Sequence, residues 1–366
     1  MSQATQPKIY VAVVGVGLVG SELISQLLSI PSSPFHLVSL SSSKRTIFQD
    51  KAPIGADWKS LLDSSSEKPD FEKLTQNLAK LNQRVAVVDN TSSEEIATLY
   101  PKWLQAGFNV ITPNKKAYSG DDGLYEAIIT TSKASGAKFL NEATVGAGLP
   151  VISTLKELVA TGDKIDKIEG VFSGTMSYIF NEFSTGKADG PKFSEVVKVA
   201  REKGYTEPHP ADDLNGFDVA RKLTILSRTI SSGSATSTSL PNLKSFAAVK
   251  TASLIPSALE GIPTGDEFIA RLPEFDDEFA KLRTEASAEG KVLRFVGVVD
   301  VSGGQVRAGL EKYPTSHPFA TSLGGSDNII MFHTERYSPR PLIVQGAGAG
   351  AAVTAMGVLG DLLKLI

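Results

Sequence analysis

The chain has 366 residues, of which 41% are hydrophobic and 21% charged, a composition typical of a globular protein large enough for two domains. Its net charge of −3 and pI near 5.9 predict no broad basic surface for nucleic acid or anionic lipid, and its first residues lack a signal-peptide pattern, so we expect a cytoplasmic protein without a membrane partner. The chain contains no cysteine, which excludes disulfides, thiolate metal sites and thioester chemistry.

The first predicted element is a strand that leads into a dinucleotide-binding fingerprint. Residues 8–15 form a short β-branched run, and a helical pattern follows at residues 21–29. Between them the chain reads G-x-G-x-x-G, in which the first glycine permits a tight turn, the second admits a pyrophosphate and the third lets helix pack on strand. The motif predicts that the cofactor is bound by Gly15, Val16, Gly17, Leu18, Val19 and Gly20.

Strands and helices then alternate up to residue 141. Strands are predicted at 35–40, 84–89, 108–112 and 138–141, and helices at 70–81, 94–106 and 122–135. This order predicts an α/β fold, a Rossmann-type doubly wound parallel sheet, in a dinucleotide-binding domain of residues 1–145. Thr91 and Ser92 follow one strand and Lys115 follows the next, at the carboxyl ends where such sheets bind ligands. Ordinary helix caps would explain such loops equally well.

The residues after the second strand bear on the choice of cofactor. An NAD-selective site usually carries an acidic residue here, but the chain has serines followed by Lys44 and Arg45. Two cations suit a 2′-phosphate, so we expect NADP, with NAD still possible. A basic surface turn is the alternative explanation.

A second pattern begins near residue 146 and continues to residue 340. Strands are predicted at 167–172, 292–301 and 305–313, with a hairpin turn at 302–304, a helix at 151–161, a polar connection at 231–240 and a solvated acidic helix at 274–289. These elements predict an α+β domain. In the last segment, 341–366, a strand at 342–345 and a turn with Gly348 precede a small-residue helix at 351–363, which we expect to return to the dinucleotide-binding domain. Gly348 fits either close packing or cofactor contact.

Asp218 and Lys222 are the strongest candidates for chemistry. Their i,i+4 spacing puts them on one helical face, within the apolar arc that includes Ile225, and an acidic loop precedes the helix. An exposed salt bridge is the usual reading of this spacing. The apolar flanks and the acidic loop favour instead a lysine held among carboxylates for proton transfer. The four histidines show no ligand spacing, so no histidine metal site is expected.

Long motifs in this chain resemble homoserine dehydrogenases, with the closest likeness to the short monofunctional fungal type. They include Asn141-Glu-Ala-Thr-Val-Gly-Ala-Gly-Leu-Pro, Ser173-Gly-Thr-Met-Ser-Tyr-Ile-Phe-Asn-Glu, Gly204-Tyr-Thr-Glu-Pro and Asp212-Asp-Leu-Asn-Gly-Phe-Asp-Val-Ala-Arg-Lys222. The resemblance implies NAD(P)H-dependent interconversion of L-aspartate 4-semialdehyde and L-homoserine, in threonine, methionine and isoleucine biosynthesis. It also implies a homodimer that pairs through the second domain's sheet, which makes residues 146–340 a substrate-binding and dimerisation domain.

The resemblance assigns roles to individual residues. Lys222 would supply the proton to the carbonyl oxygen, with Asp218 as its partner and Lys115 at the junction of cofactor and substrate. The substrate would be bound by Gly174, Thr175, Tyr205, Glu207, Asp213 and Asp218. A monovalent cation, most simply sodium, would be held by the Glu142 carboxylate and the carbonyls of Val145, Ala147 and Leu149. In the alternative, Glu142 only caps backbone N–H groups.

Two other functions compete with this one. A semialdehyde dehydrogenase acting on the same metabolite would need a cysteine thiolate, which the chain lacks. A non-catalytic NADP-sensing protein remains the alternative from another class.

Overall fold

The computed structural model describes residues 8–233 and 239–366, so the middle of the polar connection predicted at 231–240 lies outside the described residues. The chain forms two compact units. The first consists of Met1–Gly148 together with Gly350–Ile366, and the second of Leu149–Ala349. Within the described parts of the chain, no helix combines the length and the apolar character needed to cross a membrane.

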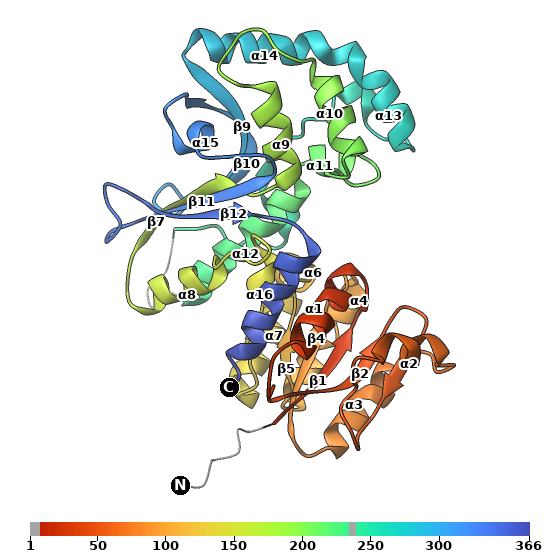
Figure 1. Cartoon of the computed structure of the whole chain (residues 1–366). Helices are drawn as coiled ribbons and strands as arrows, with labels where there is room; N and C mark the ends of the chain where they lie inside the picture. The colour runs from red at the N-terminus through yellow and green to blue at the C-terminus, as the bar shows by residue number, and fades with distance from the viewer. Residues whose placement is uncertain (1–7, 234–238) are drawn as a thin grey trace. The chain divides into compact units, whose positions relative to one another are not determined.

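The first unit is built on a six-stranded sheet in the order β3-β2-β1-β4-β5-β6. Figure 1 labels β2, β1, β4 and β5 of this sheet. Its strands are β1 (Ile9–Val14), β2 (Phe35–Ser41), β3 (Thr46–Phe48), β4 (Arg84–Asp89), β5 (Asn109–Ile111) and β6 (Phe139–Leu140). All pairs are parallel except β2–β3, which is an antiparallel hairpin. Central β1 is buried on both faces, which explains why it is an unbroken apolar run. The predicted doubly wound α/β sheet is confirmed.

Helices cover this sheet. They are α1 (Leu18–Leu28), α2 (Trp58–Ser64), α3 (Phe71–Lys80), α4 (Glu94–Ala97), α5 (Tyr100–Gln105), α6 (Lys116–Ser119), α7 (Asp122–Ser135) and α16 (Ala351–Leu363). Helices α1 and α16 lie side by side, and Leu23, Val358 and Leu362 join one apolar core (Figure 1). The predicted return of the C-terminal helix is therefore confirmed. The helix predicted at 94–106 is two helices, because Pro101 opens a second one, where a missing N–H is tolerated.

The second unit contains another six-stranded sheet, in the order β12-β11-β7-β9-β10-β8. Its strands are β7 (Ile165–Val171), β8 (Lys250–Thr251), β9 (Lys291–Asp300), β10 (Gln305–Pro314), β11 (Asp327–Thr334) and β12 (Leu342–Ala347). The predicted hairpin pairs β9 with β10 in antiparallel register, and only β8 runs parallel to its neighbour. Strand β11, between β7 and β12, was missed by the sequence analysis.

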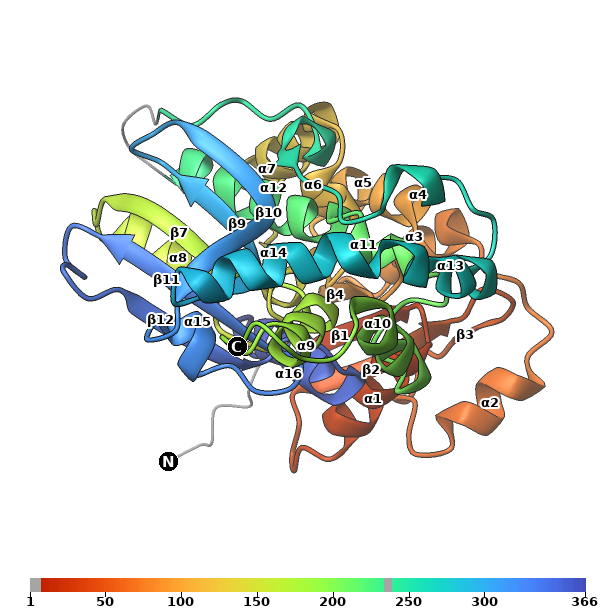
Figure 2. The same cartoon turned by 90° about the horizontal axis from the view of Figure 1, so that it is seen from above.

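The helices of this unit are α8 (Ile152–Ala160), α9 (Gly174–Phe183), α10 (Phe193–Glu202), α11 (Ala211–Leu214), α12 (Phe217–Gly233), α13 (Gly265–Arg271), α14 (Asp276–Ala288) and α15 (Pro318–Thr321). Helix α14 packs against β9 (Figure 2). It was expected to be solvated, but Phe279 and Arg283 are buried, and the Arg283 guanidinium donates to the carbonyls of Ala188 and Pro191. Asp276, the first residue of α14, is also buried and accepts hydrogen bonds from the Ser194 N–H and hydroxyl, so one of its acidic residues faces the protein rather than solvent.

The boundary predicted at residue 341 is too early. Strand β12 pairs with β11 and so belongs to the second unit, and only the chain from Gly350 onward joins the first. The earlier boundary falls at Gly148 rather than at residue 145. The strand predicted at 342–345 is present, but its pairing with β11, which makes it part of the second unit's sheet, is not visible in the local sequence.

Candidate active site

The glycine fingerprint forms a tight turn between β1 and α1. Gly15 has a left-handed φ of +88°, and a Cβ there would lie 2.6 Å from Thr91 Cγ2. A Cβ at Gly20 would lie 2.1 Å from the Gly15 carbonyl oxygen, so helix and turn touch directly. At Gly17, the N-cap of α1, a Cβ would meet nothing within 4 Å. The first and third glycines thus fill the roles predicted from the motif, and Gly17 and Leu18 are exposed at the helix N-terminus, where an anion binds favourably.

A buried carboxylate connects the two polar loops at the ends of β4 and β5. Asp89 accepts hydrogen bonds from the Thr91 N–H at 2.7 Å, the Asn114 amide at 3.1 Å and the Tyr100 hydroxyl. Burial raises the pKa of Asp89, and these donors oppose that shift. The network fixes the loop of Thr91 and the residue just before Lys115 at one edge of the sheet. Ser92 is exposed and Lys115 is partly buried there.

Lys44 and Arg45 occupy the turn of the β2–β3 hairpin. The Ser42 hydroxyl accepts hydrogen bonds from both of their backbone N–H groups. The Arg45 guanidinium pairs with the Asp63 carboxylate at 3.7 Å and donates to the Asp63 carbonyl, and both side chains remain largely exposed. The turn is therefore a basic surface with one of its two cations held by a neighbouring acid.

Lys222 lies in the second unit, on the buried face of α12. Its side chain is 9% exposed, and its ammonium contacts Asp218 Oδ2 at 2.7 Å. It also donates to the Phe172 carbonyl oxygen, at the end of β7, at 2.6 Å. Asp218 is 46% exposed, so the pair reaches the surface at the carboxylate. This geometry differs from that of a solvated surface salt bridge, because the lysine is buried and held at two points.

Asp213 joins further predicted residues close to this pair. Its carboxylate accepts hydrogen bonds from the Thr175 hydroxyl at 2.8 Å and the Glu207 N–H at 2.8 Å. Burial raises the pKa of Asp213 to about 6, and the negative charges of Glu207 and Asp218 act in the same direction. The three carboxylates therefore lie close enough to repel one another. Of the remaining predicted pocket residues, Tyr205 accepts from the Thr175 hydroxyl through its carbonyl, and Gly174 begins α9.

The turn predicted to hold a cation lies at the end of the first unit. The Glu142 carboxylate is buried and pairs with the Lys364 ammonium at 3.2 Å, and the Glu142 N–H donates to Asp361 at 2.7 Å. Val145 and Ala147 are also buried, and Ala147 has a left-handed φ of +54°. Leu149, the fourth predicted ligand, is the first residue of the other unit.

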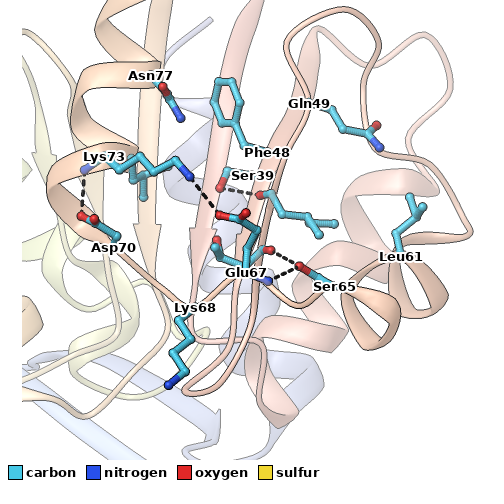
Figure 3. Close-up of a pocket in the computed structure, with 13 residues that line it drawn as sticks. Ser39, Phe48, Gln49, Leu61, Ser65, Glu67, Lys68, Asp70, Lys73 and Asn77 are labelled. Atoms are coloured by element: carbon cyan, nitrogen blue, oxygen red, sulfur yellow. Dashed lines mark hydrogen bonds and ion pairs between the residues drawn. The ribbon is translucent and has the colours of Figure 1, made fainter.

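A cavity of about 410 Å³ in the first unit contains none of the predicted residues. It is lined by β2, β3, α2 and α3 (Figure 3). Three of its charged side chains interact locally: Lys73 pairs with Glu67 at 2.9 Å, and the Asp70 carboxylate accepts a hydrogen bond from the Lys73 N–H. We assign it no part in the chemistry.

Sequence reasoning missed Asn328 and the Phe172 carbonyl. The Asn328 amide donates to the same carbonyl oxygen that accepts from Lys222. Asn328 lies on the unpredicted strand β11, and a backbone oxygen leaves no residue-specific signal. The apolar run at 329–332 could have indicated the strand, but nothing in it indicates contact with the lysine.

These parts define a class of protein. A glycine fingerprint at the end of β1 binds a dinucleotide, and a buried lysine among carboxylates can exchange a proton with a small cationic substrate. A nicotinamide-dependent oxidoreductase acting on a CH–OH group requires such parts, and comparisons with known proteins show that the protein is an enzyme of this class.

More particularly, the chain belongs to the homoserine dehydrogenase family. Residues 150–363 match the family described as homoserine dehydrogenase, and residues 15–142 match its NAD-binding domain. The chain is 50% identical to the homoserine dehydrogenase of Schizosaccharomyces pombe over 99% of its length and 96% of that protein's. It is 49% identical to that of Saccharomyces cerevisiae, with 97% of each covered. A solved Candida auris protein of unknown function matches with a TM-score of 0.91 and 44% identity, covering 98% of both chains. The non-catalytic alternative finds no support here.

Proposed function

We propose that the protein interconverts L-aspartate 4-semialdehyde and L-homoserine, in threonine, methionine and isoleucine biosynthesis in the cytoplasm. The observation that carries this proposal is the buried Lys222 ammonium between Asp218 and the Phe172 carbonyl, beside the Asp213 cluster. Homoserine-dependent reduction of NADP by the purified protein tests it. A protein that binds NADP but reduces none with homoserine would instead be a sensor.

The substrate's ammonium is the group that the carboxylates recognise. Asp213, Glu207 and Asp218 place negative charge around one point, and a bound ammonium relieves their mutual repulsion. Thr175 fixes one Asp213 oxygen, while Gly174 and Tyr205 complete the lining.

Lys222 holds and transfers the proton. When bound, the dinucleotide supplies or accepts the hydride. In the reducing direction Lys222 donates a proton to the aldehyde oxygen, so that the alkoxide is neutralised as it forms, and in the reverse direction it accepts the hydroxyl proton. Asp218 keeps the ammonium in place at 2.7 Å. Lys115, in the cofactor-binding unit, is the competing donor.

The cofactor-binding residues are those of the fingerprint, Gly15 to Gly20, with Thr91, Ser92, Lys115 and Gly348. The match to an NAD-binding domain supports nicotinamide dinucleotide binding, and we propose NADP as the preferred form. Lys44 and Arg45 would meet its 2′-phosphate.

Replacing both Lys44 and Arg45 with Ala should weaken NADP more than NAD. A lost charge-assisted contact typically costs roughly 1.5–3 kcal/mol, and only NADP carries the phosphate. Dissociation constants of the two cofactors measure the effect. Lys51→Ala, an exposed cation on the following loop, is the matched control. Equal losses for NAD and NADP would make the turn merely a basic surface.

A sodium ion is proposed at Glu142, Val145, Ala147 and Leu149, because a left-handed turn can aim carbonyl oxygens at one point as hard cations require. Activity at constant ionic strength should fall when sodium is exchanged for tetramethylammonium, and Glu142→Gln should weaken that dependence. Lys364→Gln removes the ion partner of Glu142 but no proposed ligand, so it should keep the dependence. Activity indifferent to the cation in all proteins would leave Glu142 as an ion pair only.

A homodimer is proposed through the sheet of the second unit. This six-stranded sheet leaves β12 and β8 as edges, and Ile343 on β12 is 41% exposed. Unpaired sheet edges and exposed apolar side chains require cover. Sedimentation at micromolar concentration should give twice the 38.8 kDa of one chain. A mass equal to a single chain contradicts the proposal.

A further inference from the structure

Asn328 and Lys222 share one hydrogen-bond acceptor. Asn328 is completely buried on β11, and its Nδ2 donates to the Phe172 carbonyl oxygen at 3.1 Å. Lys222 Nζ donates to the same oxygen at 2.6 Å. A carbonyl oxygen has two lone pairs, so it accepts both donors. The amide therefore fixes the direction in which the carbonyl, and with it the ammonium, is held.

The oxygen of the Asn328 amide also indicates that Asn328 acts through its donation to the Phe172 carbonyl. Asn328 Oδ1 is buried and has no hydrogen-bond partner among the residues that the structure describes. A buried acceptor without a partner destabilises a fold relative to an apolar side chain of similar shape. The opposite amide orientation would set two oxygens against each other. The favourable interaction of Asn328 is thus the donation toward Phe172.

Gly348 provides the space that Asn328 occupies. A Cβ at position 348 would lie 2.0 Å from Asn328 Cγ and 2.4 Å from its Oδ1. Gly348 is not among the glycines with left-handed backbone, so space rather than conformation requires glycine here. The glycine-rich segment after β12 therefore packs directly on the amide that contacts the Lys222 acceptor.

We propose that Asn328, in contact with Gly348, is a positioning residue that holds the Phe172 carbonyl and thereby the Lys222 ammonium in the geometry for proton transfer. The proposal rests on the proposed role of Lys222. It gives strand β11 and Gly348, both far from Lys222 in sequence, a part in positioning the proton donor.

The first test is Asn328→Leu, which keeps the size of the side chain and removes the donor. We expect the single-turnover rate of NADP reduction by homoserine to fall about 10-fold, as for a displaced catalytic group. The KM values for homoserine and for NADP should each stay within about 2-fold of those of the unmodified protein. The control is Asn181→Leu. The Asn181 amide also donates to a backbone carbonyl, that of Gly325 at 3.3 Å, and its Oδ1 also lacks a partner among described residues. Equal rates in the two variants would overturn the proposal.

The second test uses Gly348→Ala, which should slow the same step because its new methyl displaces the amide. In an Asn328→Ala background the displaced atoms are absent, so Gly348→Ala should add little to the loss of the single-turnover rate at saturating NADP, where any weaker cofactor binding is overcome. If the two losses multiply, Gly348 does not act through Asn328, and that part of the proposal fails. Thermal midpoints of each variant identify any loss that is only unfolding.

A Lys222→Ala background separates the proposed role of Asn328 from the proposed role of Lys222 as proton donor. Asn328→Leu should change the residual rate of Lys222→Ala very little if the amide acts through the lysine. The same 10-fold loss there would show that Asn328 acts elsewhere. Near-normal turnover of Lys222→Ala alone would instead remove the proposed proton donor, whatever Asn328 does.

Discussion

Replacing Lys222 with Ala should lower turnover by about 100-fold or more, the scale expected when a positioned acid is lost. NADP(H) binding should stay near normal, because the fingerprint belongs to the other compact unit. The lysine side chain is 9% exposed and is held by Asp218 and the Phe172 carbonyl, so we expect no proton donor from solvent to replace it in the variant. Steady-state rates with a cofactor titration on the same preparation measure both quantities.

Lys291→Ala is the matched control, since Lys291 is also ion-paired, to Glu289 at 2.8 Å, in the same unit. It should keep normal turnover. Asp218→Ala should damage both turnover and the KM for homoserine, because Asp218 holds Lys222 and faces the ammonium site.

Two outcomes would contradict the role of Lys222 as proton donor. Near-normal turnover in Lys222→Ala beside an inactive Lys115→Ala would transfer the acid role to Lys115. Failure of Lys222→Ala to fold would make the Asp218 pair a structural contact of helix α12.

Elements with a strong local pattern were predicted closely. Strand β4 and helices α7 and α16 have the predicted bounds, since each combines a clear period with a defined start or stop. Asp121, for example, caps the first N–H groups of α7. Local signals of this kind need no tertiary context.

Strand β11 shows where this reasoning ends. It lies between β7 and β12, and its pairing with β7, which is remote in sequence, cannot be seen locally, whereas β12 follows after a short loop. The domain boundary at 341 was wrong because β12, although predicted as a strand, pairs with β11 and so belongs to the second unit.

The candidate site divides in the same way. The spacing of Asp218 and Lys222 predicted a shared helical face, and the structure brings the two together. The roles of Glu207 and Asp213 came only from family resemblance. The raised pKa of Asp213 depends on burial and on neighbouring charges, and the Phe172 carbonyl is backbone, so neither was accessible from residue types.

Replacing Gly20 with Ala should destabilise the first unit and weaken NADP binding together. The new Cβ would lie 2.1 Å from the Gly15 carbonyl oxygen, which is backbone and cannot rotate away. Helix α1 must then move off the turn, although Leu23 and Ile24 are fully buried beneath it. Overpacking of this kind typically costs about 1–3 kcal/mol. Denaturant unfolding and NADP titration measure the two losses.

Two glycines serve as controls for this prediction. Gly360→Ala, in helix α16 of the same unit, meets nothing within 4 Å and should keep or slightly raise stability. Gly17→Ala also meets nothing within 4 Å, so it should leave stability unchanged. It should still weaken NADP, because the second glycine of the fingerprint admits the pyrophosphate. Wild-type stability in Gly20→Ala would mean that α1 shifts without loss, and the close contact with Gly15 would then not be what requires glycine there.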